Sequence, residues 1–84
     1  MKVFHIVGNE LIPIKEPYQF LNGDVYVIET EGNLWIWLGS KSFADEKFIG
    51  SWGAKQIENQ NKELKIKTIN QGLEPSEFKE QIDF

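Results

Sequence analysis

The sequence contains no cysteine and a single histidine, His5, and these two scarcities narrow what the protein can do. Without cysteine it has neither a disulfide framework nor a thiolate metal site. One histidine without cysteine cannot supply a Ser-His-Asp set, a cysteine nucleophile or a histidine-based metal cluster, and no glycine-rich phosphate loop is present. We therefore expect no enzymatic activity, and we interpret His5 as a structural or surface residue.

Long apolar runs and blocks of basic residues are missing as well. No stretch approaches the ~18 consecutive apolar residues of a membrane span, and the N-terminus lacks the features of a signal peptide. We therefore expect a soluble cytoplasmic protein. The net charge of −4 argues against binding to nucleic-acid phosphates. The densest basic stretch, formed by Lys62, Lys65 and Lys67, is diluted by Glu63 and is interpreted as a solvated strand edge.

The apolar residues that are present suffice for one core. The 84 residues are 40% hydrophobic and include 3 Trp, 2 Tyr and 6 Phe. Because the chain has no repeat, linker or low-complexity segment, we expect a single domain over residues 1–84. Segments rich in β-branched and aromatic residues predict strands, and helical patterns follow them. The predicted strands are 3–7, 11–15, 24–30, 33–38 and 64–69, and the predicted helices are 43–61 and 74–82.

The fourth predicted strand carries apolar residues on both of its faces. Leu34, Ile36 and Leu38 alternate with Trp35 and Trp37, so the two groups point to opposite sides of the strand. A strand that is apolar on both sides must be covered on both sides. The sequence therefore predicts an α+β fold in which a central sheet lies between a long and a short helix.

Four segments, taken in order, resemble the gelsolin repeat. They are Lys2–Ile6 with Leu11–Ile14, then Phe20–Ile28, then Leu34–Gly39 with Asp45 and Glu46, and finally Gln71–Phe78. Together they span nearly the whole chain. In its small size the chain resembles the free-standing single-domain gelsolin-like proteins of archaea. The resemblance implies a gelsolin-like (ADF/gelsolin-type) five-stranded mixed sheet between one long and one short helix. It also implies that the protein binds calcium and actin and acts on the cytoskeleton.

The implied calcium ligands are the Gly23 carbonyl, the Asp24 carboxylate and the Glu46 carboxylate. Oxygen donors of this kind suit calcium, a hard cation. The alternative is that Gly23 only makes a tight turn capped by Asp24, while Asp45 and Glu46 serve the dipole of the long helix.

The family binds actin through the long helix, which here has two apolar sides. If Glu46 faces the sheet, then Gly50, Gly53 and Ile57 face it too, and the large residues at 48, 49 and 52 point substantially outward. The alternative is that the large residues fill the core and the glycines face solvent. The expected actin-binding residues are Phe48, Ile49, Trp52, Lys55 and Gln56.

Three functions remain open at this point. The first is an actin regulator that binds monomers and caps or sequesters. The second is a gelsolin-like structural or protein-interaction module that does not bind actin, as in vesicle-coat subunits. The third is a homodimer that buries Trp52 against its own copy. The intact set of Gly23, Asp24 and Glu46 argues for the first of these.

Overall fold

The computed structural model describes residues 1–8, 10–42, 44–60 and 63–82, and within these it describes side chains outside 44–48. The described residues form five strands and two helices in the predicted order, with bounds that differ from the predicted ones by at most two residues. The elements are β1 (Lys2–Val7), β2 (Glu10–Ile14), β3 (Val25–Thr30), β4 (Asn33–Leu38), α1 (Ala44–Gln60), β5 (Lys65–Asn70) and α2 (Ser76–Ile82).

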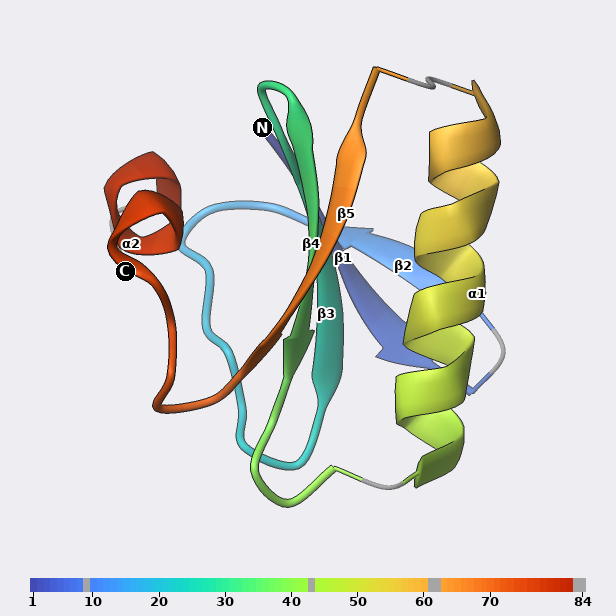
Figure 1. The fold of residues 1–84 in the computed structure, drawn as a ribbon. Coiled ribbons are helices and arrows are strands. Elements are labelled where there is room, and N and C mark those ends of the chain that lie inside the picture. The colour runs from blue at the N-terminus through green and yellow to red at the C-terminus, as the bar shows by residue number, and fades with distance from the viewer. Residues whose placement is uncertain (9, 43, 61–62, 83–84) are drawn as a thin grey trace.

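The five strands form one mixed sheet in the order β2-β1-β3-β4-β5. Neighbouring strands are antiparallel except β4 and β5, which are parallel. A parallel pair needs a crossover connection, and α1 provides it. Figure 1 shows the sheet nearly edge-on, with α1 on one side and α2 on the other. The predicted sheet between a long and a short helix is confirmed.

Each face of the sheet carries its own apolar core. The core on the α2 side contains Trp35 and Trp37, and Phe78 of α2 packs against it. The core on the α1 side contains Leu34 and Ile36. The alternation of leucine, isoleucine and tryptophan along β4 therefore separates two cores, as its two apolar faces require.

Small residues allow α1 to lie close to the sheet. A Cβ atom at Gly50 would lie 2.8 Å from Val25 Cγ1, and one at Gly53 would lie 2.6 Å from Leu11 Cδ1. Ala54, on the same side, is fully buried. The glycines thus face the sheet, and the alternative in which they face solvent is wrong. Each helical glycine costs about 1 kcal/mol relative to alanine because its backbone loses more entropy on folding. The close approach of α1 to the sheet explains why glycine nevertheless occupies these positions.

Polar side chains of α2 and of the loop before it contact the sheet, in addition to the two buried apolar residues of α2. The indole nitrogen of Trp35 donates to Gln81 Oε1 at 3.1 Å, and that of Trp37 donates to Glu74 Oε2 at 3.0 Å. Lys67 is half-buried, lies 5.2 Å above the Trp35 ring and pairs with Glu77 at 3.2 Å. Lys67 is therefore more than the solvated edge residue predicted for it, whereas Lys65 is exposed and Lys62 lies outside the described residues.

The contact between Glu74 and Trp37 gives a testable dependence on pH. Burial acts to raise the pKa of Glu74, but hydrogen bonds from Trp37, its own N–H and Gly72, together with the nearby Lys79, lower it overall. A carboxyl group whose pKa is lower in the folded state stabilises the fold at neutral pH. The ordinary pKa of this carboxyl group is 4.5. The stabilisation is therefore present above pH 4.5 and is lost as the pH falls from there through the lower pKa of the folded state.

We expect the free energy of unfolding, measured by urea titration with tryptophan fluorescence, to fall over this acidic range partly because of Glu74. Glu74→Gln removes the titrating group and flattens this part of the profile, whereas Glu31→Gln, in an exposed turn, leaves the profile unchanged. Identical acid profiles for the wild type and Glu74→Gln would contradict the assignment.

Candidate functional site

The candidate cation site lies where the turn before β3 meets the segment after β4. The N–H of Gly39 donates to the Asp24 carbonyl at 3.0 Å, and the N–H of Lys41 donates to the Asn22 carbonyl at 2.8 Å. The turn itself is closed by the Asp24 N–H, which donates to the Leu21 carbonyl at 3.1 Å. These bonds hold the start of β3 against the approach to α1, at one end of the molecule (Figure 1).

Gly39 makes this junction possible. A Cβ atom there would lie 2.6 Å from the Asp24 carbonyl oxygen and would overlap the Asn22 carbonyl oxygen as well. Both obstacles are backbone atoms, which cannot turn aside as the end of a side chain can. Residue 39 must therefore be glycine for the two segments to meet.

Gly23 is different, because no contact with the described residues requires it to be glycine. A Cβ atom at Gly23 would meet no heavy atom within 4 Å, and its φ lies outside the left-handed region. The Asn22 and Asp24 carbonyls accept the hydrogen bonds that join the two segments, and the Gly23 carbonyl accepts neither of these bonds. Its oxygen is therefore suited to another partner, and a cation is one partner that such an oxygen can take.

The Asp24 carboxylate lies among polar groups of β1 and β3. Its side chain is 26% exposed, and its Oδ2 lies 3.4 Å from Nε2 of His5. The pKa of the neighbouring Tyr26 is raised, mainly by burial and in part by the negative charge of Asp24, although the N–H of Leu21 donates to its hydroxyl at 3.1 Å. Asp24 is therefore a partly accessible anion on a rigid framework.

The side chain of Glu46, the third predicted ligand, lies outside the described residues. Its backbone belongs to the first turn of α1, and Gly50, one turn further along the same face, sits over Val25. Position 46 therefore falls on the sheet-facing side of α1. The Asp24 carboxylate, by contrast, lies beside His5, which stacks on Tyr26 of the core on the α2 side.

A carboxylate and a backbone carbonyl fit a hard cation such as calcium. Among the residues whose side chains are described, no three or more His, Cys, Asp or Glu gather into a metal-binding group. The set of Gly23, Asp24 and Glu46 remains a prediction.

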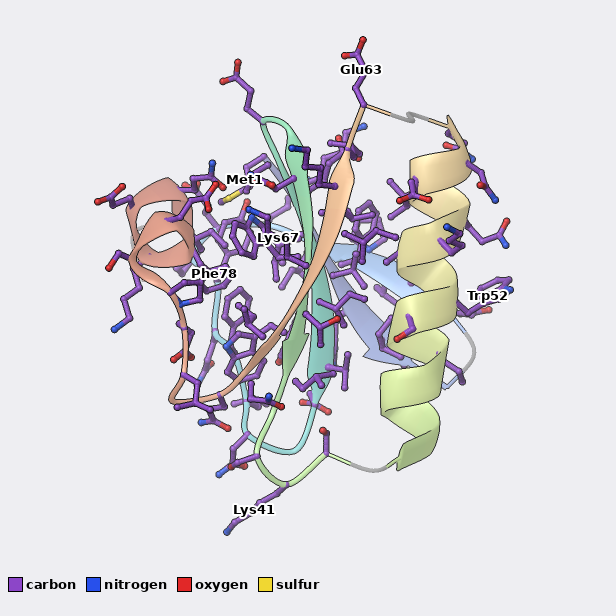
Figure 2. All side chains as sticks on the ribbon, viewed as in Figure 1. Met1, Lys41, Trp52, Glu63, Lys67 and Phe78 are labelled. Carbon is purple, nitrogen blue, oxygen red and sulfur yellow. The ribbon has the colours of Figure 1, made fainter. Side chains whose placement is uncertain are left out.

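The outer side of α1 carries the other predicted surface. Trp52 is 50% exposed and points away from the sheet (Figure 2). Lys55 and Gln56 are exposed beside it, and Lys55 Nζ pairs with Glu58 at 2.8 Å. Ile49 departs from the prediction, because it is partly buried and packs against the core on the α1 side. The side chain of Phe48 lies outside the described residues.

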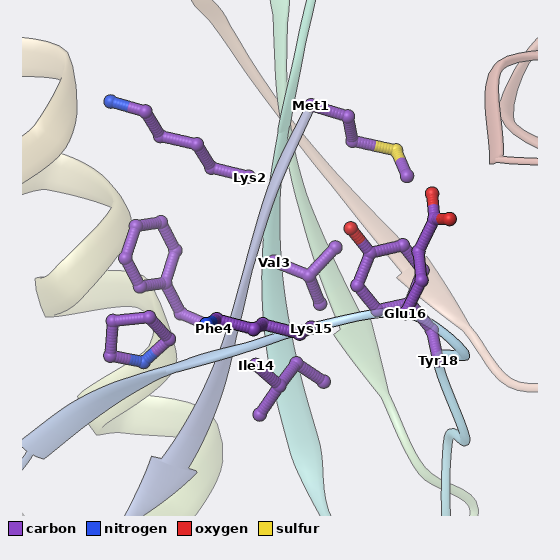
Figure 3. A pocket seen from close by; sticks show the side chains of 9 residues that line it. Met1, Lys2, Val3, Phe4, Ile14, Lys15, Glu16 and Tyr18 are labelled. Carbon is purple, nitrogen blue, oxygen red and sulfur yellow. The ribbon is translucent and has the colours of Figure 1, made fainter.

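An open pocket of about 660 Å³ lies elsewhere, beside the start of β1 and the end of β2 (Figure 3). Val3, Ile14 and Tyr18 are among its lining residues. Because β1 runs antiparallel to β3, the start of β1 lies beside the end of β3, far from the turn at Asp24. Among the predicted ligand and actin-binding residues whose side chains are described, none lines this pocket.

The contact between His5 and Asp24 was not predicted from the sequence. The pattern of β1 places His5 on the face opposite Phe4 and Ile6, and that much could be predicted. Which strand lies beside β1 depends on the sheet order, and the pairing of β1 with β3 sets His5 opposite Tyr26. No local signal in the sequence carries that information.

Comparison with known proteins places the fold in a family. A family model described as the gelsolin repeat matches residues 18–79. The structure is similar to Thorarchaeota 2DGel3 in its crystallised complex with rabbit actin, with a TM-score of 0.86 and 34% sequence identity. That match covers 94% of this chain and 41% of the other, so this chain spans about two fifths of the length of its relative.

The fold also matches Thorarchaeota ProGel, likewise crystallised with rabbit actin. The TM-score is 0.85 at 23% identity, and the match covers 94% of each chain. A search of curated proteins found no match, and no helix in the described part of the chain is long and apolar enough to cross a membrane. The family match over most of the chain, together with the mixed sheet that carries a helix on each face, shows that this protein belongs to the gelsolin repeat family.

Proposed function

We propose that this domain binds actin through the outer side of α1 and regulates filament assembly, without catalysing a reaction. The observation that carries the proposal is the half-exposed Trp52 on α1. The chain also shares 34% sequence identity with a protein that was crystallised with actin. A large aromatic side chain left in solvent on a rigid helix is typical of a binding hot spot. Lys55 and Gln56 supply a polar rim, and Phe48 is proposed to extend the contact.

The shape of α1 supports this role. Gly50, Gly53 and Ala54 hold one side of the helix against the sheet, so the opposite side is presented on a firm support. A preorganised surface binds with a smaller loss of conformational entropy than a flexible one. Ile49 supports this surface from the inner side of the helix, because it packs against the core on the α1 side.

The proposal is tested with pyrene-labelled actin and the wild-type domain. We expect the domain to slow polymerisation in proportion to its concentration and to comigrate with monomeric actin in gel filtration. Sequestration requires stoichiometric amounts, whereas capping stops growth from preformed filament seeds at substoichiometric amounts. Polymerisation that is unaffected at a large molar excess, with no comigration, would favour an interaction module that does not bind actin.

A self-associating domain would give a different result. If Trp52 packs against a second copy, sedimentation equilibrium detects a dimer, and actin polymerisation is unaffected. The two edges of the sheet do not favour pairing between copies. Pro13 lies in edge strand β2, and the exposed Lys65 lies in edge strand β5, and both residue types discourage strand addition.

We propose, further, that calcium binds at Asp24 with help from the Gly23 carbonyl and Glu46. An ion that binds only the folded state stabilises it by about 2.7 kcal/mol at a concentration one hundredfold above its dissociation constant. We expect added calcium to raise the melting temperature of the wild type and to have little effect on Asp24→Asn, which keeps the shape but removes the charge. Differential scanning fluorimetry in calcium and in EGTA measures both. An equal rise in the two proteins would place the ion elsewhere.

A further inference from the structure

Nε2 of the His5 imidazole is buried and makes no hydrogen bond within the part of the chain that the structure describes. The side chain as a whole is 28% exposed. A polar atom removed from water without a hydrogen bond destabilises the fold, so most such atoms are paired. The lack of a hydrogen bond at this buried nitrogen atom therefore needs an explanation.

The surrounding framework fixes where this nitrogen points. His5 lies opposite Tyr26 in the pairing of β1 with β3, and the two rings stack at 4.9 Å with an interplanar angle of 19°. Tyr26 is itself held by the hydrogen bond from Leu21 and by its contacts with Phe20 and Trp37. The imidazole therefore has little freedom to turn toward another acceptor.

The carboxylate of Asp24 lies close to this nitrogen. Oδ2 of Asp24 lies 3.4 Å from Nε2, and the two atoms do not form a hydrogen bond. Metal-bound nitrogen and oxygen ligands at about 2.0–2.2 Å in tetrahedral geometry lie about 3.4 Å apart. The separation of the two donors therefore suits two ligands of one ion.

We propose that His5 Nε2 and the Asp24 carboxylate bind a divalent ion of the zinc class. An imidazole nitrogen favours a borderline metal, whereas calcium prefers oxygen ligands. With two protein ligands and water at the remaining positions, the ion binds more weakly than at a four-ligand structural site. Because Asp24 is also the proposed calcium ligand, zinc and calcium compete for it. This site does not depend on actin binding.

The competing explanation is an ion pair between protonated His5 and Asp24. It uses the same two residues but gives the imidazole nitrogen no role as a metal ligand. An ion pair requires the proton to stay on Nε2, whereas metal binding requires that nitrogen to be deprotonated. The two explanations therefore differ in what zinc does to that atom.

The metal site and the ion pair are distinguished by titrating zinc into the metal-free protein at neutral pH and measuring the binding by isothermal titration calorimetry. We expect binding to the wild type and a loss of at least about tenfold in affinity in His5→Phe, which keeps a ring to stack on Tyr26, and in Asp24→Asn. Glu31→Gln, in an exposed turn away from the pair, is the matched control and should bind as the wild type does.

A second measurement keeps the proposal testable if His5→Phe fails to fold. In long-range ¹H–¹⁵N spectra of the wild type, zinc should shift the Nε2 resonance of His5 much more than the Nδ1 resonance. No zinc binding to the wild type, equal affinity in folded His5→Phe, or an unmoved Nε2 resonance would each overturn the proposal. Actin assays without added zinc judge the proposed function separately, because they do not involve zinc binding.

Discussion

Trp52→Ala should weaken the binding of monomeric actin by about 30-fold or more, the effect of losing a hot spot of at least 2 kcal/mol. The indole is half-exposed in the free domain, so it keeps a large apolar surface available for a partner. Removing it deletes that surface and leaves the two cores intact. Affinity is measured by fluorescence anisotropy of labelled actin, and the pyrene assay should lose most of its inhibition in parallel.

The stability of this variant decides how the result is read. Because Trp52 belongs to neither core, its removal should change the free energy of unfolding by less than about 0.5 kcal/mol. Leu73→Ala is the matched control, since Leu73 is 75% exposed on the loop before α2 and should leave actin binding unchanged. Unchanged affinity in Trp52→Ala, in a folded protein, would remove the proposed actin surface.

The second large effect concerns stability and falls on Gly39. Gly39→Ala should lower the free energy of unfolding by about 3 kcal/mol, because the added Cβ atom collides with two backbone carbonyls. In a domain of this size that is a large part of the total stability. The melting temperature should fall by roughly 10–20 °C.

Gly23→Ala is the matched control for this prediction. A Cβ atom at Gly23 meets no heavy atom within 4 Å, so the free energy of unfolding should change by no more than about 0.5 kcal/mol. The two glycines lie on the two segments that meet at the candidate cation site, and they differ in whether backbone atoms occupy the space beside them. Equal destabilisation by the two substitutions, measured by urea unfolding, would show that the junction is not as close as the structure has it.

Much of the fold could be predicted because the determining interactions are local. The alternation of Leu34, Trp35, Ile36 and Trp37 already demands a sheet covered on both sides, since strand geometry sends successive side chains to opposite faces. Helical spacing likewise places Gly50 and Gly53 on one side of α1 and Trp52 on another. Gly23 and Asp24 could be named as candidate ligands only through their resemblance to a family pattern.

Other features depend on which strands become neighbours, and no local pattern specifies that. His5 lies beside Asp24 only because β1 inserts next to β3. Lys67 reaches Trp35 and Glu77 only because β5 pairs with β4 beneath α2. Ile49 packs against the core because the glycines allow α1 to lie close to the sheet. Local sterics set the direction of each side chain, but contacts between segments far apart in the chain arise from the packing of the whole sheet, and these contacts decided the surroundings of Asp24.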